Sequence, residues 1–248
     1  MSQRTEDKQL FVKAFRRLTG AHPAWQIWSD FITLFAIALS NSVDRAHYED
    51  REQQYLRIIG KYRKDEQAVF PELAACVVVA LEHEPEQDFL GSVYMELELG
   101  NHWIGQFFTP YDVCRCMASL AADNALDAVR ESGYITLNDC ACGAGATLIA
   151  GVHEIRRQIA EAGYNWQHHV LVTAQDIDFT TGLMCYIQLS LLGCAGYIKI
   201  GNTLTDPMHD GDSKENYWYT PMYFSDVWAM RRHWRAVDRL FQQSGYTA

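Results

Sequence analysis

A glycine turn between a β-type run and a helical run most constrains the fold of this 248-residue chain. The β-rich residues 134–137 precede the segment 138–147 (NDCACGAGAT), and apolar residues follow it at roughly helical spacing. Gly143 and Gly145 can adopt backbone angles closed to other residues, and the start of the next helix offers free N–H groups. Such a turn is typical of an α/β fold that binds a nucleotide-like cofactor, although similar turns also occur in proteins that bind nothing there.

Two further β-type runs end in polar residues. Residues 170–175 lead into Asp176, about thirty residues after the glycine turn, and residues 197–200 lead into Gly201 and Asn202. The carboxyl ends of parallel strands form one crevice, and an acidic residue after the second strand commonly binds ribose hydroxyls. The three runs therefore predict a parallel sheet with a ligand crevice at one edge.

Four ordered motifs resemble those of adenine-N6 DNA methyltransferases, specifically the modification subunits of type I restriction systems. They are Gly105–Pro110 (GQFFTP), Asp139–Gly145 (DCACGAG), Gln175–Asp178 (QDID) and Gly201–Leu204 (GNTL). The resemblance extends from about residue 88 to residue 224. It implies an α/β, Rossmann-like, S-adenosylmethionine-dependent methyltransferase domain over residues 101–248. Apolar residues recurring at helical spacing between residues 25 and 81 predict a helical N-terminal domain over residues 1–100.

The resemblance also implies which residues bind S-adenosylmethionine. Asp139 and the region of Thr109 would bind the ammonium or carboxylate group of the cofactor. Asp176 would accept hydrogen bonds from the ribose hydroxyls, since a carboxylate is an acceptor only. Ile177 would pack on the adenine face and Asn202 would bond the adenine edge. The full predicted set is Phe107, Thr109, Asp139, Cys142, Gly143, Gly145, Asp176, Ile177 and Asn202.

The catalytic motif of the family, Asn or Asp followed by Pro, Pro and an aromatic residue, does not occur in this chain. The strand-like residues 217–219 are followed instead by Thr220, Pro221, Met222 and Tyr223, of which the first, second and fourth are the candidate catalytic residues. Thr220 lacks the combined donor and acceptor of an amide, and we expect a rate loss of about 10²–10³.

Two functions therefore stay open, together with a weaker third. The first is an adenine-N6 DNA methyltransferase of restriction-modification or mobile-element origin. The second is a catalytically silent binding or regulatory subunit that keeps the cofactor pocket. Methylation of a different acceptor is the third, because a fold does not fix a function.

The charge balance bears on how the chain meets DNA. The net charge is −10, whereas duplex binding needs lysines and arginines that neutralise phosphates. Residues 61–64 and 231–235 are dense basic clusters, which are either solvated helix faces or phosphate clamps. The resemblance implies DNA recognition through a specificity subunit. Residues after 224 leave room for one helix, from about 226 to 243, so we expect an incomplete sheet or a protein partner that completes it.

Cysteine usage and hydropathy point to the cytoplasm. The seven cysteines and the polar N-terminus of mixed charge predict reduced thiols and no export signal. The apolar run 31–39 is too short to span a bilayer, so no membrane association is expected. The spacings of Cys114 and Cys116, and of Cys140 and Cys142, lack the usual zinc-site separation, so no metal is predicted.

Overall fold

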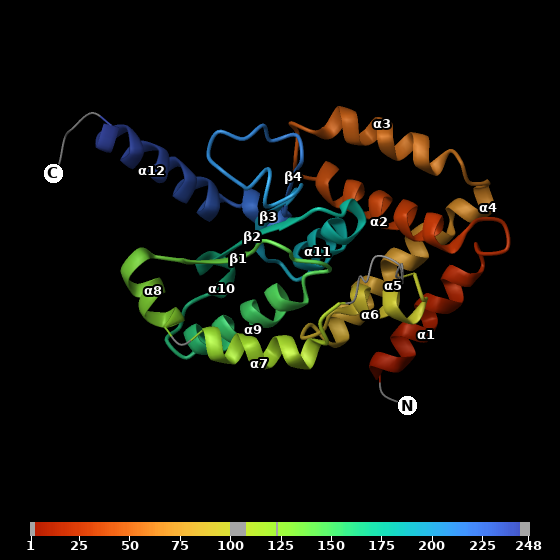
Figure 1. The fold of residues 1–248 in the computed structure, drawn as a ribbon, viewed down its shortest axis with the longest axis horizontal. Helices are drawn as coiled ribbons and strands as arrows, with labels where there is room; N and C mark the ends of the chain where they lie inside the picture. The colour runs from red at the N-terminus through yellow and green to blue at the C-terminus, as the bar shows by residue number, and fades with distance from the viewer. Residues whose placement is uncertain (1–2, 100–107, 123, 244–248) are drawn as a thin grey trace.

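The computed structural model describes residues 3–99, 108–122 and 124–243 (Figure 1). Within these residues, helices surround a four-stranded sheet of order β1–β2–β3–β4. The strands are β1 (Ile135–Asp139), β2 (Val170–Asp176), β3 (Ala195–Ile200) and β4 (Tyr217–Tyr219). The first three strands are parallel, and β4 runs antiparallel to β3. The fold is therefore mixed α/β, and the three predicted strands and their parallel order are confirmed.

One face of the sheet is apolar and covered by the connecting helices. Helix α9 (Ala146–Ala160) and the short α10 (Trp166–His169) join β1 to β2, and α11 (Phe179–Leu191) joins β2 to β3. Val172 and Ile198 are buried beneath α9 and α11, which both pack on this face (Figure 1). Buried β-branched residues on a pleated surface favour the strands themselves.

The opposite face of the sheet is more polar. Asn138, Thr173 and Tyr197 are aligned in register, and the hydroxyl of Thr173 donates to Oδ1 of Asn138 at 2.9 Å. The 3₁₀ helix η1 (Pro221–Phe224) and helix α12 (Asp226–Gln243) follow β4. Trp228 of α12 is buried against Leu171 and Ala195 on this face. The bounds of α12 match the helix predicted for residues 226–243.

The N-terminal part of the chain is helical. Its elements are α1 (Gln3–Arg16), α2 (Ala24–Asn41), α3 (Tyr48–Ile59), α4 (Lys64–Gln67), α5 (Val69–His83) and α6 (Phe89–Glu96). Helices α7 (Tyr111–Ala121) and α8 (Ala125–Ser132) then lead into β1. None of the described helices combines the length and hydrophobicity needed to cross a membrane.

The N-terminal helices and the sheet share one hydrophobic core. The same buried cluster runs from Phe11 and Trp28 in α1 and α2 to Met184 in α11 and Trp218 in β4. The helices predicted in this region are confirmed, whereas the predicted domain boundary at residues 100–101 lies outside the described residues. The shared core means that the helical part is packed directly against the part that carries the sheet.

A buried arginine connects these two parts. Arg51 of α3 donates to Oδ2 of Asp44 at 3.0 Å and to the backbone oxygen of Tyr217 at 2.8 Å. It also donates to the hydroxyl of Ser40, and its guanidinium carbon lies 3.9 Å from the centroid of the Trp218 ring. Burial lowers the pKa of Arg51, but the adjacent carboxylate of Asp44 opposes this effect. The guanidinium therefore stays charged and holds β4 against α3.

A buried histidine makes stability depend on pH. His153 of α9 is buried, and its Nε2 lies 3.1 Å from the backbone oxygen of Pro85. Burial lowers the pKa of His153, and the nearby Glu86 only partly opposes the shift. A histidine with a lowered folded-state pKa contributes stability that is complete above its unfolded pKa of about 6.5 and is lost as the pH falls below that value.

We therefore expect the free energy of unfolding, measured with urea, to fall between about pH 7.5 and about pH 5.5. The variant His153→Gln should show a smaller fall. His233→Gln is the control, because His233 lies exposed on α12. If the free energy of unfolding of His153→Gln fell with pH as much as that of the wild type, His153 would not be the source of the pH dependence.

Candidate functional site

The glycine turn predicted from the sequence joins β1 to α9. Gly143 and Gly145 have φ angles of 53° and 96°, in the left-handed region that favours glycine. The N–H of Gly145 donates to the backbone oxygen of Cys142 at 2.8 Å, which closes the turn. A Cβ on Gly145 would lie 2.9 Å from Sγ of Cys185, and a Cβ on Gly143 would lie 3.3 Å from the ring of Phe108. Cys185 and Phe108 therefore leave no space for side chains at these two glycine positions.

Asp139 stands at the end of β1 and organises the turn. Its Oδ1 accepts a hydrogen bond from the N–H of Ala141 at 3.0 Å, and its Oδ2 accepts one from the hydroxyl of Thr147. Bonds of this kind, from an acidic side chain to nearby backbone, stabilise turns. The carboxylate thus links the first residues of the turn to the first turn of α9.

Asp176 comes from the end of β2 and reaches the same turn. Its Oδ2 accepts a hydrogen bond from the N–H of Gly143 at 2.7 Å. Its Oδ1 accepts from the N–H of Asp178 at 2.9 Å and from the hydroxyl of Thr181 at 3.3 Å. Each carboxylate oxygen has two lone-pair sites, so Oδ2 can accept one more hydrogen bond. Asp139 and Asp176, both predicted from the sequence, thus each bind the glycine turn.

The loop after β3 also meets the glycine turn. The hydroxyl of Thr203 donates to the backbone oxygen of Cys140, which lies in the turn. The predicted Asn202 accepts a hydrogen bond at Oδ1 from the N–H of Leu204 at 2.9 Å. The predicted Ile177, which follows β2, is 69% exposed. An apolar side chain this exposed can cover a flat ring.

Cys142 has a packing role in this arrangement. Its side chain is buried, and its N–H donates to the backbone oxygen of Gln175 at 3.0 Å, which fastens the turn to β2. The neighbouring Cys142 thiol and burial together raise the pKa of the Cys185 thiol in α11. Cys185 is therefore a small, protonated packing group beside the buried Cys142, behind the turn.

The segment before α7 contributes an aromatic wall. Phe107 lies outside the described residues, but the adjacent Phe108 contacts the position of Gly143, and its ring centroid is 5.4 Å from that of Tyr94. Thr109 is exposed, and its backbone oxygen lies 3.8 Å from Sγ of Cys114. Phe108 was not among the predicted binding residues, although it belongs to the same motif and its aromatic side chain was the available signal.

A buried polar bracket supports the turn from behind. Nε2 of Gln188 in α11 donates to Oδ1 of Asp88 and to the backbone oxygen of Ala144, each at 2.8 Å. Oε1 of Gln188 accepts from the N–H of Leu90 at 3.1 Å. Burial raises the pKa of Asp88, which caps α6 through the N–H of Gly91. This bracket is not predictable from the sequence, because nothing in the local pattern links Asp88 to a residue one hundred positions away.

The candidate catalytic residues lie elsewhere. Because β4 is antiparallel to β3, Thr220 comes next to Gly196 at the start of β3, whereas the glycine turn lies at the ends of the parallel strands. Thr220 is completely buried, and its hydroxyl donates to the backbone oxygen of Cys194 at 2.7 Å and accepts from the N–H of Gly196 at 3.0 Å. The structure does not bring Thr220, Pro221 or Tyr223 to the glycine turn.

Comparison with known proteins gives one family. The family model described as N-6 DNA methylase matches residues 86–247. The match begins just before α6 and covers the glycine turn, the whole sheet and all of α12. No curated protein matches the chain.

Proposed function

Because the chain belongs to the N-6 DNA methylase family, we propose that it is an S-adenosylmethionine-dependent DNA methyltransferase of the adenine-N6 type that acts with a partner subunit. The observation that carries the proposal is the meeting of Asp139 and Asp176 at a glycine turn between a parallel strand and a helix. Crevices at the carboxyl ends of parallel strands are the usual nucleotide sites of α/β folds.

The residues around the turn fit such a cofactor. The free lone pair on Oδ2 of Asp176 would accept a ribose hydroxyl, and the exposed Ile177 would pack on the adenine ring. Gly143 and Gly145 allow the amino-acid end to approach the main chain, near Asp139 and the exposed Thr109. S-adenosylmethionine, when bound, supplies a methyl group activated by its sulfonium sulfur.

Asn202 and Phe108 complete the proposed cofactor site. The amide nitrogen of Asn202 remains a donor for the adenine edge while its oxygen is held by Leu204. The Phe108 ring lies against Gly143, and Cys185 lies against Gly145. This wall would exclude water from the amino-acid end of the cofactor.

The buried hydroxyl of Thr220 favours a second candidate function. A group that already donates and accepts inside the protein cannot also hold an adenine amino group, so a catalytic role for Thr220 to Tyr223 has no support from this geometry. The second candidate is a silent cofactor-binding subunit. Under the first candidate, the groups that hold the base come from a specificity or other partner subunit of a restriction-modification or mobile-element system.

Calorimetric titration with S-adenosylmethionine tests the cofactor site. Asp176→Asn should weaken binding about 10- to 100-fold, because a hydrogen bond to a charged group contributes about 1.5–3 kcal/mol. Asp127→Asn is the matched control, since Asp127 is an exposed carboxylate of α8 whose ion pair with Arg130 lies at the surface. Equal affinity of the wild type, Asp176→Asn and Asp127→Asn for S-adenosylmethionine would contradict the role of Asp176 in binding the ribose.

A second pair of variants leaves folding untouched. Ile177 and Leu204 are 69% and 92% exposed, so replacing either with serine costs little stability. Ile177→Ser should weaken binding of S-adenosylmethionine, whereas Leu204→Ser should not.

Incorporation of a labelled methyl group into DNA then separates the active methyltransferase from the silent subunit. Cofactor binding without transfer, even with candidate partners present, supports the silent subunit, and absence of cofactor binding overturns both.

A further inference from the structure

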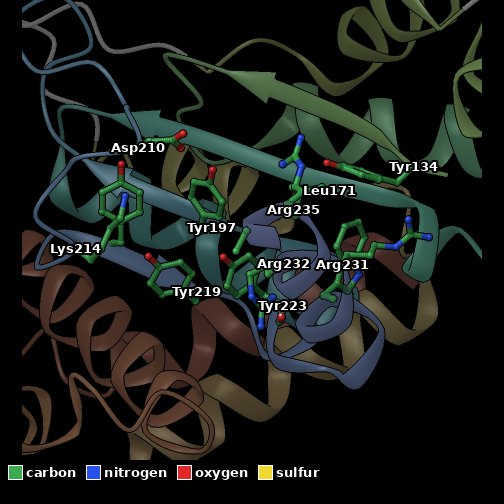
Figure 2. A pocket seen from close by; sticks show the side chains of 13 residues that line it. Tyr134, Leu171, Tyr197, Asp210, Lys214, Tyr219, Tyr223, Arg231, Arg232 and Arg235 are labelled. Carbon is green, nitrogen blue, oxygen red and sulfur yellow. Dashed lines mark hydrogen bonds between the residues drawn. The ribbon is translucent and has the colours of Figure 1, made fainter. Parts of the chain in front are cut away.

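A pocket lies on the polar face of the sheet, between the strand starts and α12. Its volume is about 520 Å³, within the range of small-molecule sites. Figure 2 shows side chains from the strands and from α12 converging on it. We call it the tyrosine–arginine pocket, after the lining residues Tyr197, Tyr219, Tyr223, Arg231, Arg232 and Arg235.

Three tyrosine rings form one wall. The rings of Tyr219 and Tyr223 are stacked, with centroids 4.9 Å apart and an interplanar angle of 29°. The centroid of Tyr197 is 5.7 Å from each of them. All three side chains are only half-buried, so part of their aromatic surface faces the pocket. Aromatic surface in such a position can stack against a flat ring.

The arginines form the other wall. The guanidinium carbon of Arg232 lies 4.0 Å from the Tyr223 centroid, and those of Arg231 and Arg235 lie 5.3 and 5.1 Å from the Tyr134 centroid. No carboxylate among the described side chains other than Asp210 forms an ion pair with these three arginines. Nε of Arg231 is buried without a hydrogen-bond partner.

The charge of the pocket is opposite to that of the chain. Lys214 adds a fourth cation, and Asp210 is the acidic residue that lines the same cavity. Figure 2 shows Asp210 beside Lys214, on the side away from Arg231. A positive pocket in a protein of net charge −10 concentrates anions locally. The basic cluster at residues 231–235 therefore contributes to a pocket rather than only to a solvated helix face.

We propose that the tyrosine–arginine pocket binds a nucleotide, either free or as one unit of a single-stranded nucleic acid. The inference rests on the two kinds of side chain that line the pocket. The tyrosine rings can stack on a base, and the arginines can bind its phosphate. The pocket lies on the polar face near Leu171 and Tyr197, whereas the glycine turn begins after the last residue of β1. The two sites are therefore separate, and the proposal does not depend on the cofactor site.

Fluorescence anisotropy of a short labelled oligothymidylate tests the proposal, with adenosine monophosphate, inorganic phosphate and a duplex as competitors. Tyr219→Leu should weaken binding of the strand about 5- to 150-fold, the usual effect of losing one stacked base. Arg235→Gln should weaken it and reduce the salt dependence by about one phosphate contact. Arg130→Gln is the control, because Arg130 is an exposed cation on α8.

Each outcome decides the proposal. Loss in both pocket variants with an unchanged control supports it, and tighter binding of adenosine monophosphate than of the strand then identifies a free nucleotide rather than a strand as the ligand. Absence of binding, binding by both variants equal to that of the wild type, or competition by inorganic phosphate as strong as that by the nucleotide overturns it. Arg235 is exposed, so its variant folds even if Tyr219→Leu does not. S-adenosylmethionine affinity should be the same in both pocket variants and the wild type.

Discussion

Arg51→Met is expected to lower the free energy of unfolding by about 3–5 kcal/mol, the usual cost of removing one partner of a buried ion pair. The substitution removes the guanidinium from the buried carboxylate of Asp44, which keeps only the ring of His47 beside the same oxygen, and removes the donor to the backbone oxygen of Tyr217. It also removes the cation from the face of Trp218. The methionine fills much of the volume, so the loss comes from the polar contacts rather than from a cavity.

Urea unfolding measures the effect of this substitution, with Arg57→Met as the matched control. Arg57 lies on the same helix as Arg51, but its side chain is exposed. Its substitution should change the free energy of unfolding by no more than about 0.5 kcal/mol. A similar loss in both variants would contradict the structural role of Arg51.

Gly145→Ala is expected to lower the free energy of unfolding by about 2–6 kcal/mol, for two separate reasons. Alanine disfavours the φ of 96°, and its Cβ would lie 2.9 Å from Sγ and 3.4 Å from Cα of Cys185. The contact with Sγ is too short for a real Cβ, so the Cys185 side chain would have to shift away from the glycine turn. We expect the same variant to lose affinity for S-adenosylmethionine.

Gly163→Ala separates the two causes. Gly163 has a φ of 81°, but a Cβ there would meet no atom within 4 Å. Its substitution should therefore cost only the backbone strain, about 1–3 kcal/mol. Equal losses in the two variants, measured by urea unfolding, would show that the contact with Cys185 is unimportant.

Much of the sheet was predictable because its strands have strong local patterns. β1, β2 and β3 are short apolar runs bounded by turn residues, and α12 begins and ends where its polar and apolar spacing indicates. The direction of β4 was not predictable. It depends on the loop between β3 and β4, which Lys199 holds by ion pairs of 2.8 Å to both Asp206 and Asp212. These contacts exist only in three dimensions, so the strand-like Tyr217–Tyr219 gave no sign that its end faces away from the glycine turn.

In the candidate site, too, the locally patterned parts were predictable and the parts built from distant segments were not. The glycine turn and Asp176 are adjacent to strand ends, so sequence order alone brings them to one edge of the sheet. Gln188 and the tyrosine–arginine pocket were not predictable as units. Their members come from distant segments, and each residue by itself has the pattern of an ordinary helix or strand position.

The shared core has a consequence for biosynthesis. Arg51 donates to the backbone oxygen of Tyr217, which is synthesised 166 residues later. Helix α2 packs against α11, which follows it in the chain by a similar number of residues. At a translation rate of about 5–20 residues per second, the face of α2 that packs against α11 stays uncovered for roughly 8–30 s on the ribosome. We therefore expect nascent chains that stop before α11 to bind chaperones or aggregate, and chains that include β4 to be released from them.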